Sequence, residues 1–246
     1  RELFSPPLRI LTVESALSSG CDSLDVVLGG GFDRGTVTQI YGPPAAGKSN
    51  IALSTAVATA INRQKTVYVD TEGVSIDRLD QIASATATDC VSRDTITEQI
   101  LFRAAHDFAE QEDAIRAATT MADDVSLIVV DSATGFYRLE RTVGDDQDDS
   151  GESLRRLTSQ ITQLLSIARK HNLAVIITNQ VYTDPETDRT RPLGGYTLEH
   201  WTGVVLRLER FRGGIRRATL EKHQSHPAGN SESFKITASG IEPADI

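Results

Sequence analysis

One segment of eight residues, GPPAAGKS at positions 42–49, has the composition and spacing of a phosphate-binding loop. Its glycines let backbone N–H groups curl around phosphate oxygens, its lysine can reach the β- and γ-phosphates, and its serine hydroxyl can bind Mg²⁺. The segment follows a strand-like stretch at residues 36–41 and opens a helical one at residues 48–62, whose positive end favours anions. We expect ATP and Mg²⁺ as cofactors, with ATP contacts at Gly42, Pro43, Pro44, Ala45, Ala46, Gly47, Lys48, Ser49 and Asn50.

Three further polar residues stand where strands are predicted to end, and each could act on a bound triphosphate. LIVVD ends in Asp131, and a carboxylate at the carboxyl edge of the sheet can reach the Mg²⁺ beside the loop. Glu72, in VDTEG, could orient the water that attacks the γ-phosphate, or could be a solvated turn acid. Gln180, in TNQ, could touch the γ-phosphate, although spacing alone favours a simple strand-end cap by Asn179 and Gln180.

The elements that must position these residues alternate between strand and helix after residue 17. This alternation predicts an α/β fold with a mostly parallel central sheet flanked by helices. Three C-terminal strands, with a hairpin turn at Gly213 and Gly214, predict an antiparallel edge on that sheet. The predicted helices are residues 23–28, 48–62, 75–87, 94–121 as a broken helix, and 152–171. The predicted strands are residues 36–41, 66–70, 126–131, 173–179, 204–209, 215–221 and 233–237.

The composition excludes several classes of protein. The 246 residues carry 25 Lys and Arg against 34 Asp and Glu, a formal charge of −9, which argues against coating nucleic acid or a membrane through bulk charge. Apolar runs are of strand length, no secretory signal pattern opens the chain, and Cys21 and Cys90 have neither metal-ligand nor disulfide spacing. We therefore expect a cytoplasmic protein with no membrane partner. The 20 Arg against 5 Lys and 20 Asp against 14 Glu are typical of proteins that work in molar salt, although biased base composition gives the same pattern.

Six segments, in one order along the chain, resemble the core of the RecA/RadA recombinase family. The resemblance is strongest to the archaeal RadB paralogues, which consist of that core without the amino-terminal helical domain of RadA. It covers about residues 17–240 and implies a RecA-type P-loop NTPase core, which we place over residues 17–246. Residues 1–16 carry a Pro-Pro pair and no clear period, so we expect them to form an extension or arm. The six segments are residues 18–31, 42–49, 68–73, 127–132, 177–181 and 192–200.

The resemblance implies a role for each candidate residue around the phosphates. It makes Glu72 the catalytic carboxylate, and it makes Lys48 a phosphate ligand that takes part in catalysis. It makes Ser49 and Asp131 the ligands of Mg²⁺. Gln180 matches the amide that senses the γ-phosphate, so the resemblance favours the functional interpretation of this residue over a strand-end cap.

Two further matches concern contacts between subunits. His200 matches a histidine that contacts the γ-phosphate across a subunit boundary, and Lys222 resembles the lysine of a K-x-R finger inserted into a neighbour's site. Gln224 stands here in place of the arginine of that finger. This departure implies slow turnover, because loss of an arginine finger can cost ~10³-fold or more.

Two segments match the DNA-binding loops of recombinases, at residues 133–152 and 181–193, and residues 207–222 form a third basic stretch. The first loop combines aromatic and arginine side chains that suit stacking on single strands, but acidic residues follow them. Molar salt weakens a purely electrostatic contact, so we expect stacking by Phe136 or Tyr137, or recruitment by a protein, to carry the association. The alternative is that these segments are merely solvated surface. The DNA-binding candidates are Phe136, Tyr137, Arg138, Arg141, Arg189, Arg191, Arg212, Arg216 and Arg217.

The resemblance implies an ATP-binding, DNA-binding accessory protein of homologous recombination and DNA repair, with weak ATPase activity and little or no strand exchange. It implies single-stranded or branched DNA, the RadA recombinase and a Holliday-junction resolvase as partners, and it allows a homo-oligomer. Two alternatives stay open at this point. One is a DNA-stimulated RecA/RadA-type recombinase, and the other is a KaiC-like regulatory ATPase that does not bind DNA.

Overall fold

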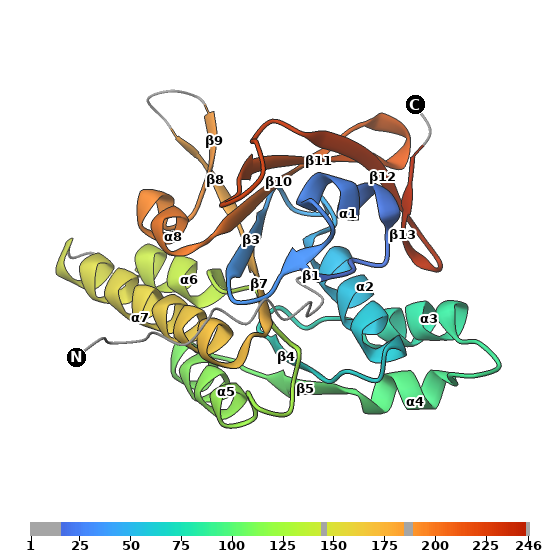
Figure 1. Ribbon diagram of the computed structural model, residues 1–246. Coiled ribbons are helices and arrows are strands. Elements are labelled where there is room, and N and C mark those ends of the chain that lie inside the picture. The colour runs from blue at the N-terminus through green and yellow to red at the C-terminus, as the bar shows by residue number, and fades with distance from the viewer. Residues whose placement is uncertain (1–15, 144–146, 185–188, 245–246) are drawn as a thin grey trace, which may run out of the picture.

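Runs of β-branched and other apolar residues form the centre of a nine-stranded sheet in the computed structural model, which describes residues 16–143, 147–184 and 189–244 (Figure 1). The strand order is β13-β12-β11-β10-β3-β7-β6-β4-β5. Strands from β10 to β5 in this order are parallel, and β10 to β13 pair antiparallel, as predicted. The strands are β3 (Val37–Tyr41), β4 (Thr66–Asp70), β5 (Ile100–Ala104), β6 (Leu127–Asp131), β7 (Ala174–Asn179), β10 (Val204–Arg210), β11 (Ile215–Lys222), β12 (Ser231–Thr237) and β13 (Gly240–Pro243).

Helices cover both faces of this sheet, which is why its central strands are apolar on both sides. Helices α1 to α4 pack on one face over a cluster that includes Leu53 and Tyr68. Helices α5 to α8 lie on the other face, over a cluster that includes Val69 and Leu164. The helices are α1 (Asp22–Leu28), α2 (Lys48–Ile61), α3 (Ile76–Thr86), α4 (Arg93–Glu98), α5 (Phe108–Thr120), α6 (Gly135–Val143), α7 (Gln147–His171) and α8 (Gly195–Trp201).

The prediction of a broken helix over residues 94–121 is wrong in its middle, where strand β5 separates α4 from α5. Strand β5 lies at the edge of the sheet, parallel to β4, and most of its residues are exposed or half-exposed. Its apolar run is only three residues long, at residues 100–102, and a run of that length does not distinguish a strand from a helix. Helix α5 starts afresh because the side chain of Asp107 accepts the backbone N–H of Glu110 at 2.8 Å, and the carboxylate of Glu110 accepts the N–H of His106 at 2.8 Å.

Residues 133–152, expected as a DNA-binding loop, are largely helical in the structure. Helix α6 and the first turns of α7 occupy most of the segment, so α7 begins at Gln147 instead of residue 152. Tyr137 is buried and Phe136 is half-buried in the cluster beneath α5 and α7. The centre of the acidic stretch, residues 144–146, lies outside the described part of the chain.

The two ends of the chain complete the architecture. Strand β1 (Ala16–Leu17) pairs with β2 (Phe32–Asp33), while the expected N-terminal arm lies outside the described residues except for Ala16. The turn predicted at Gly213 and Gly214 joins β10 to β11, with positive φ angles of 73° and 78°. Strand β13 was not predicted.

Within the described residues, no helix has the length and apolarity needed to span a membrane.

Candidate nucleotide-binding site

The predicted phosphate-binding loop connects β3 to α2 at the carboxyl edge of the sheet and lines a cavity of about 440 Å³. The shape of the loop depends on residues that have a small side chain or none. A Cβ atom on Gly42 would lie 2.6 Å from the backbone oxygen of Leu208, and Gly47 caps α2 with a φ of 107°. Ala45 also has a positive φ, of 60°. Such a turn before a helix leaves backbone N–H groups available for an anion.

The loop residues divide between the cavity and the core. Gly42, Pro44, Ala45, Gly47, Lys48, Ser49 and Asn50 line the cavity, as do Glu72 and Gln180. Ala46 is fully buried in the hydrophobic core, so its expected contact with ATP can come only from its backbone. Pro43 does not line the cavity, but its carbonyl accepts a hydrogen bond from Lys48 Nζ at 3.3 Å.

The Lys48 ammonium is held at the mouth of the loop by carbonyl oxygens. Its Nζ donates to the carbonyl of Gly42 at 3.0 Å, and the residue is 9% exposed. Burial lowers the pKa of Lys48, and the nearby carboxylates of Glu72 and Asp131 act in the opposite direction. The ammonium therefore lies in the field of two carboxylates, where a triphosphate with Mg²⁺ would bring further charges of both signs.

Asp131 is positioned by neutral donors from three parts of the site. Its carboxylate accepts the hydroxyl of Tyr68 at 2.7 Å and the hydroxyl of Thr178, and it is also hydrogen-bonded to the side chain of Ser49. Burial raises the pKa of this carboxyl group, and the three hydroxyl donors oppose that shift. Ser49 and Asp131 thus face one another as the predicted Mg²⁺ ligands. Such a pair suits a hard cation that takes its remaining oxygens from water and phosphate. Among the described residues, no group of three or more His, Cys, Asp or Glu side chains offers another metal site.

Glu72 lies two residues beyond the end of β4, on a loop that the side chain of Asp70 fixes. The carboxylate of Asp70 accepts the backbone N–H groups of Glu72, Gly73 and Val74 at 3.1, 2.9 and 2.8 Å. The Glu72 Oε1 atom accepts the hydroxyl of Ser132 at 2.6 Å. Neither Asp70 nor Ser132 had a predicted role here. The contacts of Asp70 are local, and an Asp directly before a Gly-containing turn in VDTEG is the signal that could have found them. LIVVDS contains Ser132, but only the packing of β4 beside β6 reveals its contact with Glu72.

The Gln180 side chain connects Glu72 to helix α6. Its Nε2 donates to Glu72 Oε1 at 2.6 Å, and its Oε1 accepts Arg138 Nη1 at 2.9 Å. Asn179, the other candidate cap, turns inward instead and donates to the carbonyl of Leu193 at 2.8 Å. Arg138 was expected only as a DNA contact, and the structure places it on the wall of the nucleotide cavity.

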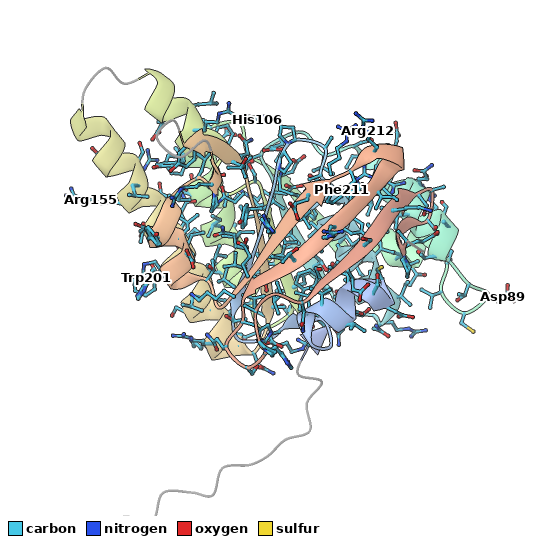
Figure 2. The ribbon with its side chains drawn as sticks, turned by 90° about the horizontal axis from the view of Figure 1, so that it is seen from above. Asp89, His106, Arg155, Trp201, Phe211 and Arg212 are labelled. Carbon is cyan, nitrogen blue, oxygen red and sulfur yellow. The ribbon has the colours of Figure 1, made fainter. Side chains whose placement is uncertain are left out.

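Several DNA-binding candidates occupy positions that differ from the prediction. Tyr137 is only 4% exposed, so it is a core residue and not part of an exposed aromatic platform. Arg216 lines the nucleotide cavity instead of the outer surface, whereas the Arg217 guanidinium lies over the Phe211 ring at 4.9 Å. Figure 2 shows Phe211 and Arg212 together at the tip of the β10–β11 hairpin.

Of the remaining candidates, Arg189 and Arg191 lie on β9 (Arg189–Pro192), which forms a hairpin with β8 (Val181–Asp184), and Arg141 lies on α6. Arg191 stands opposite Tyr182 in the register of these strands. The side chains of Arg141 and Arg189 lie outside the described part of the structure. The β8–β9 hairpin projects beside α8 (Figure 1), so the segment retains the exposed position expected of a ligand-binding loop.

His200 and Lys222 lie away from the nucleotide cavity of their own chain. With Trp201 they line a separate hollow of about 170 Å³, which does not include the phosphate loop. The His200 and Trp201 rings meet edge to face at 5.1 Å, and Lys222 Nζ donates to the carbonyl of Glu199. Figure 2 shows Trp201 at the outer surface beside α7.

Comparison with known proteins agrees with this geometry. Residues 12–244 match the Rad51 family. The chain belongs to the Rad51 family. It is 56% identical to the DNA repair and recombination protein RadB of Halobacterium salinarum over 94% of this chain and 96% of that protein. It is 42% identical to RadB of Methanococcoides burtonii over 94% and 99%, respectively. A crystal structure titled as the RadB recombinase superposes with a TM-score of 0.79 at 38% identity, covering 93% of this chain and all of that one.

These relatives confirm the predicted resemblance to RadB and the RecA-type fold, and the Halobacterium relative fits the expected high-salt origin. Proteins of the RecA/Rad51 family bind ATP, usually with Mg²⁺, and those that act in recombination generally act on DNA. In this Rad51-family chain the tight glycine turn, the buried lysine and the facing Ser49 and Asp131 fit a Mg²⁺-bound nucleotide.

Proposed function

We propose that this chain binds ATP with Mg²⁺, hydrolyses it slowly, and acts on DNA as an accessory protein of recombination and repair with little or no strand exchange. The observation that carries the proposal is the placement of Glu72 and Gln180 on the same cavity as Lys48 and Ser49. Bound Mg²⁺ would neutralise charge on the phosphates, held by Ser49 and Asp131. Lys48 would bind phosphate oxygens, and Glu72 would orient water and accept its proton.

Slow turnover is supported by the residue at the finger position. Gln224 provides no cation where a finger arginine would stand, which weakens hydrolysis without weakening the binding of the nucleotide in the same chain. The contacts of Glu72 act on its position instead. Its Oε1 atom accepts hydrogen bonds from Ser132 and Gln180, which fix the carboxylate and leave its other oxygen to accept a water molecule.

The first experiment measures ATP turnover and the binding of a fluorescent ATP analogue in molar KCl, with and without single-stranded DNA. We expect Glu72→Gln to lower turnover by ~10²-fold, the size of a general-base contribution, and to leave affinity for the analogue unchanged. Lys48→Ala should abolish binding. Glu98→Gln, on the exposed surface of α4, is the matched control and should change neither quantity. Full turnover by the Glu72 variant, or unchanged binding by the Lys48 variant, would contradict the proposal. Strong stimulation by DNA would favour a working recombinase instead.

For DNA we propose that stacking comes from Tyr182 and Tyr196, because Tyr137 is buried. Tyr182 on β8 is 40% exposed and Tyr196 on α8 is 81% exposed. Both residues come after Gln180, which directly follows β7. Base stacking survives molar salt, where phosphate contacts weaken. The double variant Tyr182→Ala with Tyr196→Ala should lose about tenfold or more in affinity for labelled single-stranded DNA, measured by fluorescence anisotropy. Unchanged affinity would exclude these rings as the DNA platform.

We also propose, from the resemblance to RadB proteins, that the RadA recombinase and a Holliday-junction resolvase are protein partners. The outward position of His200 and Lys222 supports contacts with a second subunit, because neither side chain lines its own nucleotide cavity. Light scattering with and without ATP tests self-assembly. Co-purification with the RadA recombinase and with the resolvase tests the two proposed protein contacts. Loss of assembly in a Lys222→Ala variant would support the subunit contact, and intact assembly would argue against it.

A further inference from the structure

The β11 strand places two adjacent arginines on opposite sides of the sheet. Side chains alternate along a strand, and Arg216 shares its side with Ala218 and Leu220, both fully buried in the core. Arg217 faces the other way, over the ring of Phe211. Arg216, Ala218 and Leu220 therefore form a row that points toward the core, and Arg216 is the member nearest the β10–β11 turn. In the strand register Arg216 is paired with Phe234 of β12.

This inward row ends at the phosphate-binding loop. The Arg216 Cδ atom lies 3.4 Å from the point that a Cβ atom on Gly47 would occupy, and Ile236 of β12 approaches the same point to 3.2 Å. The guanidinium Nη2 is 3.5 Å from the carbonyl oxygen of Ala45, and Nη1 donates to the carbonyl of Gly214 at 2.6 Å. Arg216 thus rises from the antiparallel edge of the sheet and forms part of the cavity wall beside the loop.

The charge of Arg216 is not neutralised within the part of the chain that the structure describes. No carboxylate pairs with it there, and its Nε atom is buried without a hydrogen-bond acceptor. Burial lowers the pKa of the Arg216 guanidinium, and the neighbouring Arg210 acts in the same direction. A half-buried cation with an unused donor is costly unless an anion completes its contacts. Among the described residues that line the cavity, Lys48 and Arg138 are the other cations and Glu72 is the only acid.

We propose that Arg216 is a phosphate-binding residue of this site, whose guanidinium contacts the phosphate groups of a nucleotide bound in the same chain. The inference rests on the proposed function, in that it requires the cavity to take ATP. It adds a cation from the C-terminal hairpin to the lysine of the loop. Arg216, which the sequence predicts as a DNA contact, is thereby assigned to the nucleotide.

The test is an equilibrium titration with a fluorescent ATP analogue in molar KCl, followed by displacement of the analogue with inorganic tripolyphosphate. Arg216→Gln should weaken both the analogue and tripolyphosphate by about tenfold, as expected for the loss of one charge-assisted contact. Arg103→Gln, an exposed arginine on β5 at the opposite edge of the sheet, should leave both affinities unchanged. Arg216→Met keeps the aliphatic stem against the P-loop and β12, and it should show the same loss if the Gln variant does not fold.

The outcomes separate this inference from the function on which it rests. Wild-type affinity in the Arg216 variants would overturn the inference and leave the proposed function intact. Weaker binding of the analogue with unchanged binding of tripolyphosphate would also overturn it, because the guanidinium would then contact the base or ribose. Failure of the wild-type chain to bind the analogue at all would overturn the proposed function itself.

Discussion

The Gln180 amide nitrogen lies 2.6 Å from the Glu72 carboxylate, to which it donates a hydrogen bond. The amide oxygen of Gln180 accepts Arg138 at the same time, so one side chain links β4, β7 and α6. Gln180 cannot turn toward a γ-phosphate without releasing one of these partners. A movement of Arg138 will therefore also move Gln180, and with it the Glu72 carboxylate that we expect to orient water.

Removal of the amide should separate positioning from binding. We expect Gln180→Ala to lower the maximal rate of ATP hydrolysis by about tenfold with little change in the affinity for the ATP analogue, because Glu72 loses a donor that fixes it. Gln180→Glu should be worse, because it places a second carboxylate against Glu72. Steady-state kinetics in molar KCl and analogue titrations give the two quantities. A loss confined to affinity would show that Gln180 acts as a ligand and does not position Glu72.

The Ser49–Asp131 pair predicts a specific dependence on Mg²⁺. Asp131→Asn keeps the size of the side chain but removes its charge, so the concentration of Mg²⁺ needed for half-maximal nucleotide binding should rise by about tenfold. Binding of the analogue without Mg²⁺ should change much less. A Mg²⁺ titration of both proteins distinguishes this outcome from general damage, which would lower binding at every Mg²⁺ concentration.

Tyr137 and Tyr182 should respond in opposite ways to truncation. Tyr137→Ala removes a ring from the core and should lower the free energy of unfolding by about 3 kcal/mol or more, measured by urea denaturation. Tyr182→Ala removes an exposed ring and should change the free energy of unfolding by about 0.5 kcal/mol or less. A mild effect of the Tyr137 change would mean that this ring is accessible in solution, and would restore it as a candidate for stacking.

The buried His223 ring should make stability depend on pH. Its side chain is 1% exposed, and burial lowers its pKa below 6.5, opposed by Asp33, which lies 3.3 Å from Nε2. The unfolded chain therefore takes up this proton first as the pH falls, so the contribution to stability is present above the unfolded pKa and is lost below it. From about pH 7.5 to about pH 5.5 the melting temperature should drop by about 2–4 °C more in the wild type than in His223→Gln. Equal slopes in the two proteins would exclude His223 as the titrating group.

Local chemistry explains what the sequence predicts well. The positions of Lys48 and Asp131 depend on a motif and on an apolar strand, each of which is contained in a few neighbouring residues. The central parallel strands are predicted for the same reason, because both of their faces are buried. The edge strand β5 is missed because its apolar run of three residues, 100–102, is too short to distinguish a strand from a helix.

The other misses depend on tertiary contacts. The inward side of Arg216 depends on strand register, and a shift of one residue would exchange it with Arg217. The contacts that place Arg138 on Gln180 and Tyr137 in the core join segments far apart in the chain. No pattern within either segment specifies them.

The walls of the nucleotide cavity come from nearly the whole length of the polypeptide, from Gly42 in the loop after β3 to Ile236 in β12. A nascent chain that has left the ribosome only as far as β10 has the loop but lacks the wall made by β11 and β12. Affinity for nucleotide must therefore mature later than the loop and its helix, when β11 and β12 add to the sheet. A premature stop before β11 would in the same way remove a wall of the site while leaving its loop and helix in place.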